Sequence, residues 1–128
     1  MTESAAYVDT SWIIAIALKE RGYAALKRRL EEFTDIYSAN LLEAELLATL
    51  KSERVALDSV ILERVGWVVP VRALRREIET VLAAGFVRGA DCWHLASALY
   101  AADRPSDFTF LTLDKKQLAI AKALGFRT

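Results

Sequence analysis

Short apolar runs alternate with stretches of helical periodicity along this chain. The runs have the length and composition of buried β-strands and cover 5–8, 36–38, 67–69, 108–112 and, at the C-terminal end, 126–128. Helices are expected at 10–21, 26–33, 41–50, 57–65 up to Gly66, 72–84, 91–99 and 116–124. Strands that alternate with helices pair in parallel through right-handed crossovers. The pattern therefore predicts one α/β domain over 1–128, a three-layer α/β/α sandwich.

Composition narrows the possible classes of protein. The longest apolar run, 12–18, is far shorter than the roughly 20 residues that cross a bilayer. The N-terminal residues lack a signal-peptide pattern and the chain has one cysteine, so a cytoplasmic protein with no membrane contact is expected. The hydrophobic fraction of 54% exceeds the usual range of about 45–50%, which predicts apolar surface covered by a partner. The net charge of zero leaves nucleic-acid binding to local basic groups.

Two carboxylates directly follow predicted strands. Asp9 comes after the run 5–8, and Asp114 comes after the apolar residues 108–113. Carboxyl ends of parallel strands meet at one edge of a sheet, where ligands bind in open α/β folds. Two carboxylates at about 4 Å repel each other by about 4 kcal/mol if the effective dielectric constant is near 20. A cation is therefore expected between the acids.

Glu45 and Asp91, near the starts of two predicted helices, complete a set of four acids in apolar surroundings. Carboxylate-rich sites suit Mg²⁺ or Mn²⁺. Such an ion can polarise a phosphodiester, activate a water molecule for in-line attack and hold the leaving oxygen. Asp9 and Asp91 are the expected principal ligands, with Asp114 and Glu45 completing the shell directly or through water. Each acid also has a simpler interpretation, as a helix cap or as a first-turn residue that favours the helix dipole.

Four stretches together resemble the signature segments of PIN-domain ribonucleases. They are YVDTSWIIA at 7–15, SANLLEAELLATL at 38–50, GADCWHLASAL at 89–99 and FLTLDKKQLAIAKALGF at 110–126. An acid lies in each stretch, the order is that of the family, and the compact size is similar to that of the VapC toxins of bacterial toxin–antitoxin pairs.

The resemblance implies a Rossmann-like sandwich with a parallel sheet in the order 3-2-1-4-5. It implies a metal-dependent endoribonuclease that uses Mg²⁺, with Mn²⁺ as a possible substitute, to hydrolyse RNA by metal-activated water. It implies the same four acids as catalytic residues. It also implies a homodimer and a cognate, VapB-like antitoxin that covers the cleft. The RNA target and the number of metal ions stay open.

The second acid has a rival in Glu43, because residues two apart on a helix point to nearly opposite faces. Alignment with the family's acid followed by Leu-Leu favours Glu45. The hydroxyls of Ser11 and Thr112 are expected to orient Asp9 and Asp114; the alternative is a helix cap and an ordinary strand residue.

Further polar residues near the acids invite two interpretations. Arg88, Lys115 and Lys116 are candidate RNA contacts, and an exposed loop charge is the alternative for Arg88. His94, one turn after Asp91, could bind metal or act as a base, but a hydrogen bond to a neighbouring carboxylate is the preferred interpretation. Cys92 is expected to be buried, and the three tryptophans are expected in the core or an interface rather than under RNA bases.

Two other α/β classes fail at a named residue. A phosphoryl-receiver domain needs an aspartate after its third strand, where this chain has Val69 and Pro70. A haloacid-dehalogenase-type phosphatase needs a second aspartate at the position of Ser11. The remaining alternative to the nuclease is a non-catalytic PIN-like module that binds RNA or protein.

Overall fold

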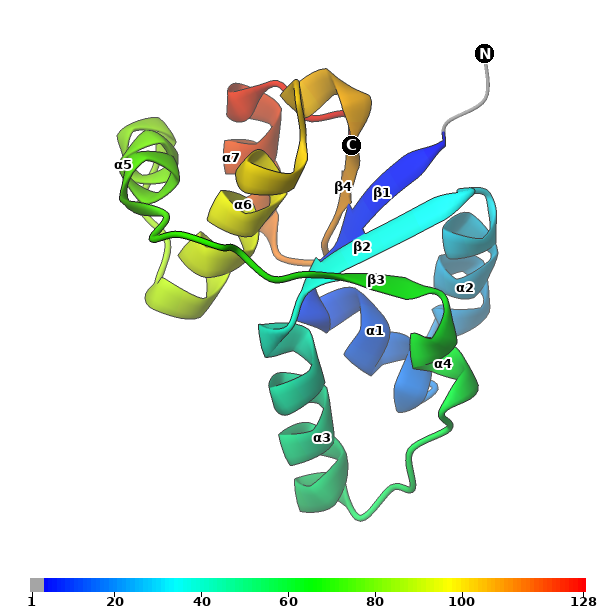
Figure 1. The fold of residues 1–128 in the computed structure, drawn as a ribbon. Helices are drawn as coiled ribbons and strands as arrows, with labels where there is room; N and C mark the ends of the chain where they lie inside the picture. The colour runs from blue at the N-terminus through cyan, green and yellow to red at the C-terminus, as the bar shows by residue number, and fades with distance from the viewer. Residues whose placement is uncertain (1–3) are drawn as a thin grey trace.

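A four-stranded parallel sheet organises the chain in the computed structural model, which describes residues 4–128. The strands follow the order β3-β2-β1-β4 (Figure 1). They are β1 (Ala5–Val8), β2 (Asp35–Ala39), β3 (Val65–Val68) and β4 (Thr109–Leu111). The helices are α1 (Thr10–Ala17), α2 (Tyr23–Glu31), α3 (Leu41–Glu53), α4 (Val60–Glu63), α5 (Arg75–Ala84), α6 (Gly89–Ala101) and α7 (Lys115–Leu124), with a short 3₁₀ turn, η1 (Pro105–Asp107).

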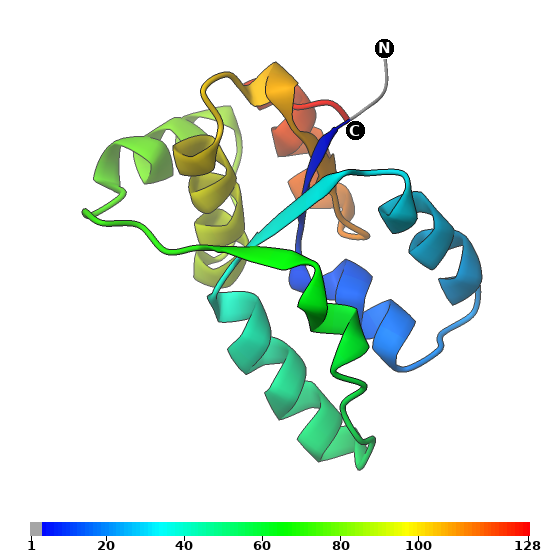
Figure 2. The same cartoon turned by 45° about the vertical axis from the view of Figure 1, so that its right-hand side comes forward.

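Helices cover both faces of the sheet, so the predicted α/β/α sandwich is confirmed. Helices α5, α6 and α7 lie on one side and α1 to α4 on the other (Figures 1 and 2). Alternate side chains of the central strand β1 enter the two cores: Tyr7 packs among residues of α5, α6 and α7, whereas Ala6 and Val8 pack with α1, α2 and α3. This alternation follows from the two-residue repeat of a strand.

The third strand differs from its predicted position. Gly66 was expected to end a helix over 57–65, but it lies inside β3, and α4 has only four residues. Val65 pairs with Ile36 and is buried, while Gly66 lies against the ring of Tyr37, where an added Cβ would come within 3.0 Å. Pairing with β2 therefore overrides the helical spacing of the apolar residues in this segment.

Several other boundaries also shift. Helix α1 ends at Ala17 instead of Arg21, and Lys19 after it has a positive φ of 52°. The predicted fifth strand is not formed in the described residues. Arg127 makes a single parallel bridge to Thr109, with backbone hydrogen bonds to Phe108 and Phe110. One paired residue is too little for a strand. The first four positions of the predicted order, 3-2-1-4, are therefore confirmed, and the predicted fifth strand is not seen in the described residues.

Two of the three tryptophans pack against the cores. Trp12 and Trp93 are half-buried against the two cores, as predicted, but Trp67 on the edge strand β3 is exposed. Cys92 is buried, as expected. Within residues 4–128, no helix has the length and apolar character needed to traverse a bilayer.

Candidate active site

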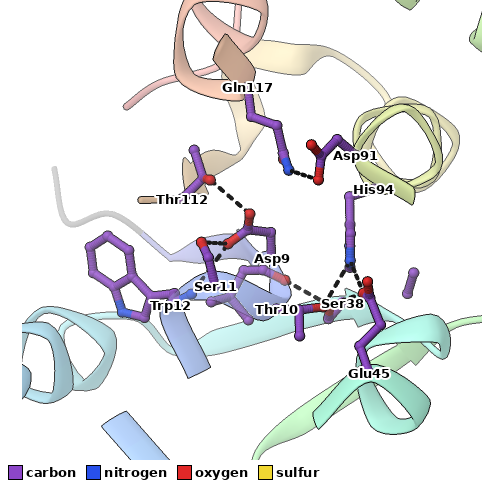
Figure 3. A network of polar contacts seen from close by, with 12 residues as sticks. Asp9, Thr10, Ser11, Trp12, Ser38, Glu45, Asp91, His94, Thr112 and Gln117 are labelled. Atoms are coloured by element: carbon purple, nitrogen blue, oxygen red, sulfur yellow. Dashed lines mark hydrogen bonds and ion pairs between the residues drawn. The ribbon is translucent and has the colours of Figure 1, made fainter. Parts of the chain in front are cut away.

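All four predicted acids line one cavity of about 250 Å³ at the carboxyl end of the sheet. Asp9 follows β1, Glu45 lies on α3, Asp91 on α6 and Asp114 at the start of α7. Figure 3 shows Asp9, Glu45 and Asp91 approaching one another from these separate elements. The other lining residues are Thr10, Ser11, Ile14, Thr49, His94 and Gln117. Residues more than 80 positions apart in the sequence thus share one small polar space.

Asp9 is buried, and every hydrogen bond it accepts comes from a neighbouring loop or helix. Its Oδ1 accepts hydrogen bonds from the Ser11 hydroxyl at 2.7 Å and the Trp12 backbone N–H at 3.3 Å, and its Oδ2 accepts one from the Thr112 hydroxyl at 2.7 Å. Asp9, rather than Thr10 or Ser11, is therefore the N-cap of α1. Burial raises the pKa of Asp9, although these donors and nearby His94 oppose the shift.

The hydroxyls of Ser11 and Thr112 also bind the loop that leads to Asp114. The Ser11 oxygen accepts a hydrogen bond from the Leu113 N–H at 3.1 Å, and the Thr112 oxygen accepts one from the Asp114 N–H at 3.0 Å. Both hydroxyls donate to Asp9 at the same time. They therefore couple the position of the Asp9 carboxylate to the segment that joins β4 and α7.

Gln117 links Asp91 and Asp114, and sequence reasoning missed it. Its side-chain Nε2 donates to Asp91 Oδ1 at 2.8 Å, and its backbone N–H donates to Asp114 Oδ1 at 3.2 Å. Lys116 N–H donates to the same Asp114 oxygen at 2.7 Å, so Asp114 caps α7. The Gln117 side chain is 1% exposed, and its Oε1 has no partner in the described structure. The only available signal was its position three residues after Asp114, on the inner face of the predicted helix.

Glu45 faces the cavity, whereas Glu43 is exposed and does not line it. Glu45 Oε1 accepts hydrogen bonds from the Thr10 hydroxyl at 2.6 Å and from His94 Nε2 at 3.1 Å. The His94 hydrogen bond is the main cause of a lowered Glu45 pKa, against a smaller opposing effect of burial, and Thr10 adds to the lowering. His94 thus makes the carboxylate contact that was its preferred interpretation.

A buried tyrosine sets the orientation of His94. The Tyr7 hydroxyl accepts a hydrogen bond from the Ala39 N–H at 3.0 Å and lies 2.7 Å from His94 Nδ1. The Tyr7 oxygen already accepts a hydrogen bond from the backbone, so its O–H is free to donate to His94 Nδ1. The proton of the neutral imidazole then lies on Nε2 and points at Glu45. Burial raises the pKa of Tyr7, which keeps its hydroxyl protonated.

A second cavity of about 440 Å³ opens beside the first and shares Asp91 and Asp114 with it. Its other lining residues are Phe86, Val87, Arg88, Lys115 and Lys116. The three cations predicted as RNA contacts therefore lie together, next to two of the acids.

Convergent acids at strand ends are possible in more than one α/β fold, so the family assignment depends on the whole pattern. The PIN domain family matches residues 6–123, a span that contains all four acids and the strands that bring them together. The chain belongs to the PIN domain family. PIN domains are a family of metal-dependent nucleases that generally use Mg²⁺ and act on nucleic acid. No curated protein and no solved structure matches the chain.

The donors in this PIN domain cavity fit a hard divalent cation. They are carboxylate and hydroxyl oxygens, and within residues 4–128 the single ion-pair contact of the four acids is that of Glu45 with His94. In the same residues, no three His, Cys, Asp or Glu side chains converge closely enough to enclose an ion by themselves. Mg²⁺ commonly binds through one or two carboxylates and keeps several waters, so it does not need such a cage.

Proposed function

We propose that this PIN domain is a Mg²⁺- or Mn²⁺-dependent endoribonuclease that hydrolyses RNA phosphodiester bonds. The observation that carries the proposal is the cavity in which Asp9, Glu45, Asp91 and Asp114 meet; within residues 4–128, His94 is the one basic side chain that lines it, and it pairs with Glu45. Like charges confined together favour a bound cation. Burial raises the pKa of Asp9, so a bound cation would favour the ionised form of this carboxylate.

Asp9, Asp91 and Asp114 are the residues proposed to hold the ion. When Mg²⁺ is bound, such a site gains a charge that polarises the phosphodiester and a water molecule of lowered pKa. Ser11 and Thr112 hold the Asp9 carboxylate at 2.7 Å each, so little side-chain motion is left to restrict when ligands bind.

Glu45 is proposed to orient the attacking water rather than to bind the ion directly. Thr10 and His94 both donate to its Oε1, which fixes the side chain and lowers its pKa. A carboxylate that stays ionised can accept a proton from water near the phosphate. His94 is 1% exposed and makes its contacts with Tyr7, Thr10 and Glu45, so its proposed part is to hold Glu45.

We further propose that the protein is a toxin of the VapC kind, a homodimer restrained by a VapB-like antitoxin. Its compact size and exposed apolar side chains away from the acid cavity support this role: Val71 is 91% exposed and Val60 63%. Expression of the wild-type chain in a bacterial host is expected to arrest growth, and Asp9→Asn is expected to relieve the arrest. Unimpaired growth on wild-type expression would contradict the toxin role, but it would not bear on the nuclease proposal, which has its own assay.

The nuclease proposal is tested by incubating the purified protein with transfer, ribosomal and messenger RNA in Mg²⁺ or Mn²⁺. Site-specific cleavage is expected, and EDTA or Asp9→Asn should abolish it. Glu45→Gln should lower the rate by about 10²-fold or more, as for loss of a general base. Glu43→Gln is the matched control and should change the rate little, because Glu43 is exposed outside the cavity.

Two results of this assay would contradict the assignment. If folded wild-type protein cleaves none of these RNAs, the chain is better explained as a non-catalytic PIN module that binds RNA or protein. If Glu43→Gln is as damaging as Asp9→Asn while Glu45→Gln is mild, the wrong acid of α3 has been assigned.

A further inference from the structure

Phe86 is an exposed aromatic side chain at the rim of the active-site region. It is 75% exposed, whereas the other four phenylalanines of the chain are at most 8% exposed. It lies between α5 and α6 and lines the second cavity together with Lys115 and Lys116. A single exposed apolar ring is not unusual by itself, so the residues around it decide what it could bind.

The surroundings of Phe86 are suited to a polyanion. Arg88, Lys115 and Lys116 are exposed, and none of them forms an ion pair within residues 4–128. The chain as a whole has no net charge, so this is a local concentration of positive charge. Cations beside an aromatic face form the arrangement that binds single-stranded nucleic acid, in which phosphates meet the cations and bases stack on the ring.

The second cavity adjoins the acid cavity, because Asp91 and Asp114 line both. It is therefore the place where a nucleotide next to a phosphodiester held at the acids could bind. The volume of about 440 Å³ is in the range of pockets for small organic ligands, roughly 300–1,000 Å³. A base can reach an aromatic face only if it is not stacked within a helix, because base faces in a duplex are covered by their neighbours.

We propose that Phe86 is a stacking platform for an unpaired base next to the scissile phosphate, and that Arg88, Lys115 and Lys116 bind the flanking phosphates. This inference rests on the proposed nuclease function, since the acids define where the phosphate lies.

A protein surface is the competing occupant of the same ring. Phe86 also borders an apolar groove of about 350 Å³ with Leu82 and Trp93. A protein contact there would cover Leu82 and Phe86 together, whereas RNA stacking uses Phe86 alone with the neighbouring cations. RNA is favoured because three unpaired cations and two of the acids share the cavity with the ring.

The test measures RNA binding in a protein that carries Asp9→Asn, so that cleavage does not consume the probe. Fluorescence anisotropy follows a labelled unstructured oligoribonucleotide and a fully paired duplex of the same sequence. Phe86→Ala should weaken binding of the unpaired strand by about 5- to 150-fold, the loss typical of one base–aromatic stack. Phe86→Trp should restore it, duplex binding should not change, and Leu82→Ala should leave both affinities within about twofold of the parent.

Three outcomes would overturn the proposal. One is an unchanged affinity for the unpaired strand in Phe86→Ala, and another is an equal loss for strand and duplex. The third is a shift in sedimentation caused by both Phe86→Ala and Leu82→Ala without a change in RNA affinity, which would assign the ring to a protein contact. Because these measurements record binding, they separate failure of the stacking platform from failure of the nuclease, which the cleavage assay reports.

Discussion

Gln117 joins two acids that come from different helices. One hydrogen bond from its amide orients Asp91, and its backbone N–H helps to cap α7 through Asp114. Its Oε1 is buried and has no hydrogen-bond partner within residues 4–128, which costs about 1–3 kcal/mol. Gln117 is therefore a positioning residue: its amide N–H orients Asp91 although its own carbonyl oxygen is left without a donor.

Gln117→Met tests this role, because methionine is similarly shaped but makes no amide hydrogen bonds. RNA cleavage is expected to fall about 10- to 100-fold, as for loss of a group that orients a ligand. The free energy of unfolding should change by less than about 1 kcal/mol, since one made hydrogen bond and one unmet acceptor disappear together. Cleavage assays and urea unfolding measure the two effects, with Lys122→Met on the exposed face of α7 as the control. Unchanged cleavage in Gln117→Met would show that Asp91 needs no such partner.

The Tyr7 hydroxyl provides hydrogen-bond partners for two buried polar groups. Tyr7→Phe would leave the Ala39 N–H without its acceptor and His94 Nδ1 without its donor. Each unmet group costs about 1–3 kcal/mol, so a loss of about 2–5 kcal/mol in the free energy of unfolding is expected by urea denaturation. Tyr37→Phe is the matched control on the adjacent strand, where the ring stacks on Phe108, and should cost much less. Equal losses in both variants would refute the network.

Among the helices, α7 begins with a residue that has two roles, Asp114. Asp114 caps the helix through Lys116 and Gln117, and the same carboxylate lines the cavity. Serine is also a good N-cap, so Asp114→Ser should keep the free energy of unfolding within about 0.5 kcal/mol, while Asp114→Ala should lose about 0.5–2 kcal/mol. Both variants should lose RNA cleavage. A serine variant that still cleaves would show that capping is the only task of this acid.

Element boundaries were predictable only where local signals were strong. Gly125, with φ of 98°, ends α7 where the sequence predicted, because few other residues tolerate that conformation. Gly66 gave the same signal but lies inside β3, where the ring of Tyr37 packs against it. That contact comes from a strand almost 30 residues away, and helical periodicity within 57–65 carries no information about it.

For the molecule as a whole, the sequence predicted that the acids would converge. It did not predict the hydrogen bonds that hold them in place. Asp9 and Asp114 meet because parallel strands bring their carboxyl ends to one edge, a consequence of topology that a sequence pattern can indicate. The hydrogen bonds made by Tyr7, Thr10 and Gln117 depend on side-chain directions across three layers. These uncharged residues gave no signal of the contacts beyond the position of Gln117, three residues after Asp114.

Asp9, Asp91 and Asp114 of this PIN domain are proposed to hold a divalent cation. The most direct measurement is calorimetric titration of the wild-type protein with Mn²⁺, beside a variant with Asp9→Asn and Asp91→Asn together. Binding to the wild type is predicted, with an affinity at least about 10-fold weaker in the variant because two oxygen ligands lose their charge. Equal affinity in the two folded proteins, or no binding to either, would contradict the account.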